Sequence, residues 1–113
     1  MQYEIDYSPD FTAQFKRLKK RHRSFTDDFD DFKKQLLDNP LQGTELTPGI
    51  RKIRMAITSK GGGKSGGARA ITANAIIAEH QGRIAFLYIY DKADVSNIKL
   101  NVMKKIAHDM GFE

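Results

Sequence analysis

The chain has 113 residues, a formal net charge of +5 and no cysteine. The length predicts one domain over residues 1–113 with one core, and the lack of cysteine excludes disulfides and thiolate metal sites. No apolar run approaches the roughly 20 residues of a membrane span, and the N-terminal MQYEIDYS lacks the features of a signal peptide. We therefore expect a cytoplasmic protein.

The first 40 residues predict a strand followed by two helices. Polar and apolar residues alternate over residues 2–7, as in a half-buried strand. Ser8 and Pro9 are typical of an N-cap and a first-turn proline. Ser24 is expected to open a second helix, which Pro40 ends.

The two helices carry opposite charges where they meet. Each cluster suits the dipole of its own helix, and an antiparallel hairpin should bring the two clusters together. The first helix ends with basic residues and the second begins with acidic ones: Lys19, Lys20, Arg21 and Arg23, then Asp27, Asp28, Asp30 and Asp31.

The second half predicts a loop over residues 41–49, three strands and a final helix. The strands are expected near residues 50–58, 67–79 and 82–92, with a tight hairpin turn at Gln81-Gly82. The run IAFLYIY is apolar on both faces, which indicates a central strand. The final helix should be capped by Asp94 or Ser96, with an apolar face of Ile98, Val102, Ile106 and Met110.

The predicted fold is α+β. It has a small, mainly antiparallel sheet, an N-terminal helical hairpin and a C-terminal helix, in the order β-α-α-β-β-β-α.

A stretch without acidic residues dominates the charge pattern. Six basic side chains and no acid lie between Leu46 and Ala78: Arg51, Lys52, Arg54, Lys60, Lys64 and Arg69. Cations on a sheet beside a glycine-rich loop suit a polyanion, and nucleic acid is the commonest one. A basic stretch that is only a solvated surface is the alternative.

Strand alternation refines this expectation. Lys52 and Arg54 should share one face, where adjacent cations can hold successive phosphates. Lys60 and Lys64 lie in the loop TSKGGGKSGG, which is either a mobile ligand-binding loop or a disordered one without a role. The Gly63-Lys64-Ser65 sequence resembles part of a P-loop, but a strand follows it instead of a helix, so we reject that interpretation.

The end of the last predicted strand adds a second candidate group. Tyr88, Tyr90 and Lys92 should share a face. Tyrosine can stack on a base or move a proton, and lysine can hold a phosphate, whereas packing is the alternative role for both tyrosines. His22, His80 and His108 have no metal-ligand spacing, so we expect no metal site.

The strings GIRKIRMAI, GKSGGAR and GRIAFLYIYDKAD together resemble the RelE/ParE superfamily of bacterial toxins, with the HigB-like group as the nearest branch. The resemblance spans roughly residues 30–110. It implies the toxin of a type II toxin–antitoxin pair and a ribosome-dependent endoribonuclease that cleaves mRNA. The implied partners are a cognate antitoxin, the ribosome and mRNA, with no membrane and no small-molecule cofactor.

The resemblance and the charge pattern together give a set of candidate site residues. The expected chemistry is metal-independent attack of the RNA 2′-OH on the adjacent phosphate. Arg54 and Arg69 would stabilise the phosphorane, Lys52 or Lys92 would act as base with a lowered pKa, and Tyr90 would stack or donate a proton. RNA binding is expected from Arg51, Lys60 and Lys64.

Arg69 is also expected to be a surface residue without a partner, so that its replacement should leave the fold intact. The rival function is a non-catalytic nucleic-acid-binding protein or a ParE-like toxin directed at DNA gyrase. It fits the absence of the Glu and His that some family ribonucleases use.

Overall fold

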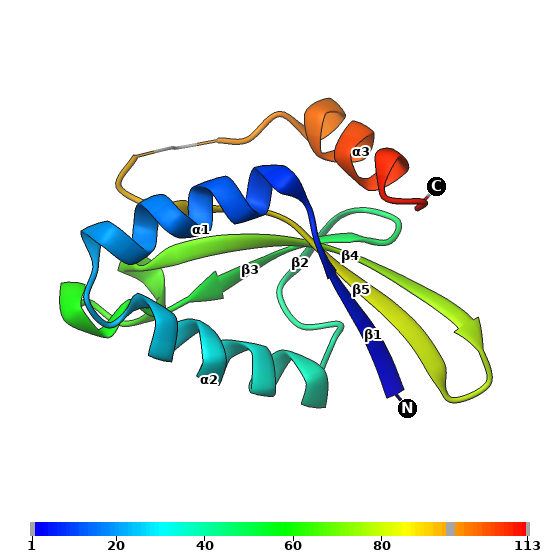
Figure 1. The fold of residues 1–113 in the computed structure, drawn as a ribbon, viewed down its shortest axis with the longest axis horizontal. Helices are drawn as coiled ribbons and strands as arrows, with labels where there is room; N and C mark the ends of the chain where they lie inside the picture. Colours follow the sequence, from blue (N-terminus) through cyan, green and yellow to red (C-terminus); the bar gives the residue numbers. More distant parts are fainter. Residues whose placement is uncertain (1, 95–96, 113) are drawn as a thin grey trace.

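The computed structural model describes residues 2–94 and 97–112, which form five strands and three α-helices (Figure 1). In chain order these are β1 (Gln2–Tyr7), α1 (Pro9–Arg21), α2 (Phe25–Asp38), β2 (Thr44–Thr47), β3 (Ile50–Met55), β4 (Ala68–Ala78), β5 (Gln81–Asp91) and α3 (Leu100–Asp109). Two 3-10 turns, Thr58–Lys60 and Lys64–Gly66, lie in the loop between β3 and β4. The predicted α+β fold class is confirmed, with β2 as an additional strand.

The strands form one sheet in the order β1-β5-β4-β3-β2. β1 runs parallel to β5, and the other neighbours are antiparallel. β5 therefore lies inside the sheet, as its doubly apolar sequence predicts. Opposite β4, the pairing changes from Ile71↔Tyr88 to Thr72↔Phe86, so that Leu87 forms a bulge.

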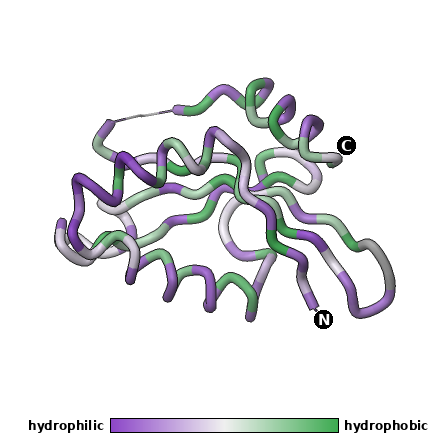
Figure 2. Tube along the Cα trace, in the orientation of Figure 1, coloured by the Kyte–Doolittle hydropathy of each residue, from purple (hydrophilic) through white to green (hydrophobic). Residues whose placement is uncertain are grey.

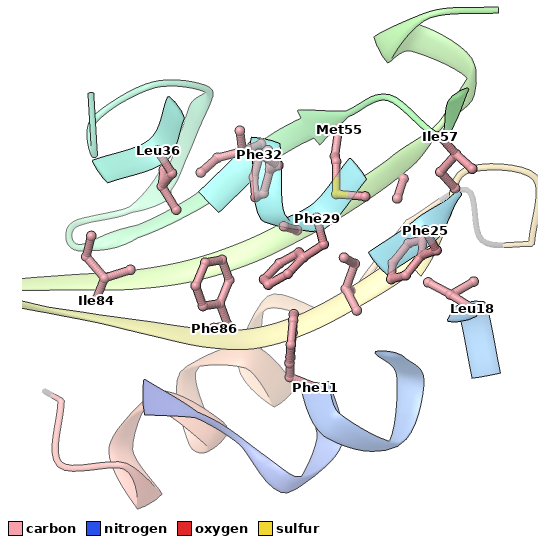
Figure 3. Close-up of a cluster of buried hydrophobic side chains, with 14 residues drawn as sticks. Phe11, Leu18, Phe25, Phe29, Phe32, Leu36, Met55, Ile57, Ile84 and Phe86 are labelled. Carbon is pink, nitrogen blue, oxygen red and sulfur yellow. The ribbon is translucent and has the colours of Figure 1, made fainter. Parts of the chain in front are cut away.

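The helical hairpin of α1 and α2 covers one face of the sheet. Figure 2 shows polar and apolar residues alternating along both helices, and Figure 3 shows their apolar side chains packed against the strands. The Phe11 ring lies 5.5 Å from Phe29 and 5.3 Å from Phe86, measured between ring centroids. Ile53, Met55 and Ile57 of the predicted inward face belong to this cluster.

The other face carries a second core under α3. Its buried members are Ile50, Ile71, Ala73, Ala85, Leu87, Tyr90, Met103, Ala107 and Phe112. Arg83 fastens the end of α3, because its guanidinium donates to the Met110 carbonyl and lies 4.4 Å from the centroid of the Phe112 ring. None of the helices within the described ranges has the length and apolar character needed to cross a membrane.

Both helices start at the predicted N-cap residues, but only Ser8 of α1 makes a side-chain capping bond. Ser8 caps α1 by accepting a hydrogen bond from the Phe11 amide. Ser24 precedes α2, but its hydroxyl donates to Asp28 instead of capping the helix.

The oppositely charged ends of α1 and α2 lie on either side of the short link between the two helices. No ion pair joins the two clusters in the described part of the chain; Arg21 pairs with Asp91 and Asp94 instead.

Two predicted connections are corrected. The segment 41–49 is not all loop, because β2 pairs with β3 inside it. The hairpin turn is at Glu79-His80, not at Gln81-Gly82, and His80 takes the left-handed conformation with φ 62°. Gly82 is inside β5, where a Cβ would lie 2.6 Å from the Tyr3 ring, so close packing accounts for this glycine.

The final helix begins later than its predicted caps. Lys99 is the N-cap of α3, Asp94 lies in the turn after β5, and Ser96 lies outside the described residues. Val102 is 44% exposed, so its predicted place on the apolar face is wrong; Met103 and Ala107 are buried instead. The error follows from the later start of the helix.

Gly67 joins the loop to the sheet. A Cβ at this residue would lie 2.1 Å from the Met55 carbonyl oxygen and 2.8 Å from the Ile57 amide nitrogen. Only glycine allows the end of the loop to approach β3 this closely.

We expect Gly67→Ala to lower the free energy of unfolding by about 1–3 kcal/mol, because a backbone must move to make room for the methyl group. Gly66→Ala is the matched control, since open space surrounds that position and the effect should stay within about 0.5 kcal/mol. Urea unfolding of both variants measures the difference, and equal values for the two would contradict this account of Gly67.

Candidate nucleic-acid site

Strand register places three of the predicted site residues in one row. Arg54 of β3 lies opposite Arg69 of β4, and Arg69 lies opposite Tyr90 of β5. Residues opposite each other in neighbouring strands point to the same face with Cβ atoms roughly 5 Å apart. Lys52, two residues before Arg54, shares that face as predicted.

These side chains border a cavity of about 390 Å³. Its lining residues are Gln42, Gly43, Thr44, Lys52, Ile53, Arg54, Lys64, Arg69, Tyr90 and Lys92. Five of them are cationic and none is acidic. All five predicted catalytic residues and one predicted RNA-binding residue, Lys64, therefore lie around one cavity, although their roles stay predictions.

The cations of the cavity have no acidic partners within the described residues. Among residues 2–94 and 97–112, no carboxylate forms an ion pair with Lys52, Arg54, Lys64, Arg69 or Lys92. Like charges directly opposite each other destabilise a sheet. An anion bound between Arg54 and Arg69 would remove this repulsion.

Arg69 differs from its prediction as a free surface residue. It is 5% exposed, and its guanidinium donates to the carbonyls of Lys64, Ser65 and Ala68. Burial and then the charge of Arg54 lower the pKa of Arg69 from its ordinary value, while Tyr90 raises it. Arg69 therefore holds the end of the loop as well as facing the cavity.

Tyr90 is also more buried than expected. It is 4% exposed and packs into the core under α3, so that little of its ring is free to stack on a base. Burial raises the pKa of Tyr90, and Arg69 lowers it in part. A neutral hydroxyl at the cavity wall can donate a hydrogen bond or a proton.

A family model for the RelE toxin of the RelE/RelB toxin–antitoxin system matches residues 11–111. The chain belongs to the RelE toxin family. It is therefore the toxin of a toxin–antitoxin system, and the family implies an antitoxin as its partner. The HigB-like branch stays a prediction.

Two predicted RNA-binding residues of this RelE family member lie outside the cavity. Arg51 donates to the carbonyls of Gln42 and Gly43 and lies 3.6 Å from a carboxylate oxygen of Glu45. Lys60 forms an ion pair of 2.6 Å with Asp91. The loop that carries Lys60 is thus anchored at this end, unlike the disordered loop of the alternative interpretation.

The sequence reasoning missed Asp91. Its carboxylate is 2% exposed and binds Lys60 at 2.6 Å, the Ala93 amide at 2.9 Å and His22 Nε2 at 2.7 Å. Arg21 lies 3.4 Å away. The sequence held one indication of its place. Asp91 lies between Tyr90 and Lys92, and side-chain alternation in a strand predicts that it points to the opposite face of the sheet.

The histidines and acidic residues of the described ranges form no cluster that could bind a metal ion. In the ranges that the structure covers, no group of three His, Asp or Glu residues has the arrangement of a metal site. His22 is held by Asp91, and His80 lies in the exposed hairpin turn.

Asp91 should make the free energy of unfolding depend on pH in the acidic range. Burial alone raises the pKa of Asp91, but hydrogen bonds from Lys60, the Ala93 amide and His22 outweigh it and lower the pKa from 3.8 to about 2. The stabilisation is therefore complete above pH 4 and is lost as the pH falls toward 2. The shift corresponds to about 2 kcal/mol.

We expect Asp91→Asn to be less stable than the wild type at pH 6, with a difference that shrinks by about 2 kcal/mol between pH 5 and pH 2. Denaturant unfolding across this pH range measures it. Asp94→Asn, which removes only the exposed partner of Arg21, should change stability by less than about 1 kcal/mol. A constant difference between Asp91→Asn and the wild type would show that the carboxylate is not held in this way.

Proposed function

We propose that this toxin is a ribosome-dependent endoribonuclease that cleaves mRNA without a metal ion and so inhibits translation. The observation that carries the proposal is the cavity with five cations and no acid, which suits a phosphate. Membership of the RelE toxin family supports it, because toxins of this family are generally endoribonucleases. The proposed place of action is the cytoplasm, where the ribosome and mRNA are the partners.

The proposed reaction is an internal transfer at the RNA phosphate. The 2′-oxygen attacks the adjacent phosphorus, the bond from phosphorus to the 5′-oxygen breaks, and the products are a 2′,3′-cyclic phosphate and a 5′-hydroxyl. Negative charge grows on the non-bridging oxygens during the attack. Arg54 and Arg69 lie directly opposite each other, which suits them to share this charge.

Two protons must move in this reaction. Lys52 or Lys92, in the neutral form, would take the proton of the 2′-hydroxyl, and both line the cavity. Tyr90 would give a proton to the leaving 5′-oxygen, since its hydroxyl is neutral and lies beside Arg69. Lys64 at the rim would hold a neighbouring phosphate.

The ribosome would supply what the cavity lacks. Lysine side chains on an open surface do not fix the direction of attack, and alignment of the reacting groups contributes a large part of such rate enhancements. The antitoxin would compete for the same charge: an acidic segment of the partner would complement the cavity.

The deciding experiment maps the ends of mRNA after incubation of the toxin with translating ribosomes. Cuts inside codons, with a cyclic phosphate on the upstream fragment, support the proposal. Intact mRNA overturns it, and accumulation of cleaved DNA in cells would then favour the gyrase-directed alternative.

We expect Arg54→Ala to lower the single-turnover cleavage rate about 100-fold or more, because a donor to the transition state is lost. Arg54 is exposed and no carboxylate in the described residues pairs with it, so the fold should not change. Lys104→Ala, an exposed cation on α3, is the matched control and should cleave at the wild-type rate. Equal rates for the two variants would remove Arg54 from the reaction.

We expect binding of a non-cleavable RNA strand to depend steeply on salt. Four phosphate contacts predict a slope of about −3 for log K against log salt, and Lys64→Ala should reduce its magnitude by about 0.7. Fluorescence anisotropy between 50 and 300 mM salt, about the range over which such contacts weaken, measures the slope. A slope near zero in the wild type would mean that these cations do not bind phosphate.

A further inference from the structure

Asp91 lies next to the cavity in sequence but outside it in space. Its neighbours Tyr90 and Lys92 line the cavity, whereas the Asp91 carboxylate points to the other face of the sheet. There it meets side chains from three segments: the end of α1, the link between α1 and α2, and the loop after β3. Asp91 thus joins parts of the chain that are far apart in sequence.

The loop 58–67 is fastened at both ends and free in the middle. At its start, Thr58 donates its amide to Asp28, the Ser59 amide donates to Ser24, and Lys60 pairs with Asp91. At its end, the carbonyls of Lys64 and Ser65 accept from Arg69, and the Lys92 amide donates to the Gly67 carbonyl.

Among the described residues, the middle of the loop is bonded only within the loop itself: the Gly61 amide donates to the Thr58 carbonyl, and the Ser65 hydroxyl donates to the Gly62 carbonyl. Gly61, Gly62 and Gly63 have φ values of 76°, 78° and 63°, and open space surrounds the position of each Cβ. The place of Lys64 at the cavity therefore depends on the anchors on either side.

Asp91 is the buried charged anchor at the start of the loop, as Arg69 is at its end. Thr58, Ser59, Ser24 and Asp28 meet at an exposed surface, whereas Asp91 is 2% exposed and Lys60 donates to it at 2.6 Å. The same carboxylate accepts the Ala93 amide, which fixes the chain just beyond Lys92. One side chain thus contacts both the start of the loop that carries Lys64 and the chain just beyond Lys92.

Asp91 also keeps the two groups of charges apart. It neutralises Lys60 and Arg21 on the far side of the sheet, and it contributes no carboxylate to the cavity. If the side chain of Asp91 lay on the cavity side, it would pair with Arg69 or Arg54 and compete with a phosphate.

We propose that Asp91 is a positioning residue of this site, which holds Lys64 and Lys92 at the cavity through its bonds to Lys60 and the Ala93 amide. The proposal rests on the proposed ribonuclease function for its effect on rate, and on the geometry alone for its effect on the loop. Asp91 touches no substrate, and its loss should shift Lys64 and Lys92 by about 1 Å, which lowers the rate of cleavage but leaves their attraction to RNA phosphates in place.

The test compares Asp91→Asn and Lys60→Met with Asp6→Asn. Asp6 forms an ion pair of 3.0 Å with Arg83, far from the cavity lining, so that this control also removes an aspartate from an ion pair. All measurements are made at a temperature at which circular dichroism shows each variant fully folded.

We expect Asp91→Asn and Lys60→Met to lower the single-turnover cleavage rate on ribosomes about tenfold or more, because displacement by roughly 1 Å disturbs the alignment of the reacting groups. Affinity for a non-cleavable RNA strand should stay within about twofold and the salt slope should not change. Asp6→Asn should cleave at the wild-type rate. Wild-type rates in folded Asp91→Asn overturn the proposal, and so does a smaller salt slope in Lys60→Met, which would make Lys60 a phosphate contact.

Hydrogen exchange of residues 58–69 separates failure of this proposal from failure of the proposed function. Exchange in this segment should be faster in Asp91→Asn than in the wild type, with protection in β4 and β5 unchanged. This readout needs no cleavage. Unchanged exchange in the loop overturns the positioning role even for an active enzyme, whereas faster exchange in a protein that cleaves no mRNA supports the role and overturns only the ribonuclease.

Discussion

The alternation of side chains at the end of β5 is the constraint on which the site depends. Tyr90 and Lys92 point to the cavity, and Asp91 between them points to the other face of the sheet. Tyr90 and Asp91 end β5 and point to opposite faces, as a strand requires, and Lys92 lies in the turn that follows. The Asp91 carboxylate pairs with Lys60 and Arg21 and not with a cation of the cavity, and its bond to Lys60 holds the start of the loop that carries Lys64.

The unpaired cations are tolerated because the rest of the sheet is well supported. Fourteen buried residues among those described form the core between the sheet and the helices α1 and α2, and a second core lies under α3. Arg54 is exposed, but Arg69 is buried, so their repulsion is only partly screened, and the two cores outweigh it. Such local destabilisation is expected where a protein is prepared for an anion that is absent from the free state.

Short-range patterns predicted most of the fold. The alternation of polar and apolar residues predicted β1 and the inward face of β3. The start of α1 was predicted from Ser8 and Pro9, and the interior position of β5 from its doubly apolar run. Errors arose where distant contacts decide the structure. The segment of β2 is extended because it pairs with the edge of β3. Residue 82 must be glycine because the Tyr3 ring packs against it, and not because it lies in a turn.

The residues of the candidate site were likewise predicted where local patterns decide their position, and missed where distant contacts do. Strand alternation and family resemblance together brought Lys52, Arg54, Tyr90 and Lys92 to one face. The partners of Asp91 come from residues 21, 22 and 60, and no local pattern connects these positions. The ion pair of Lys60 could not be predicted for the same reason. A lysine in a glycine-rich loop does not indicate that its partner is a buried carboxylate about 30 residues away in the chain.

Arg69 shows why structure and chemistry at this site are difficult to separate by truncation. Its guanidinium donates to three carbonyls and also faces the cavity. An alanine there removes the donor to these carbonyls, of which that of Ala68 is in a buried bond, so lost activity would combine displacement of the loop with loss of charge. Lysine would keep the charge but lose the planar fork that serves several carbonyls at once. Arg54 has no such second role among the described contacts, and its replacement reports on the charge of the cavity alone.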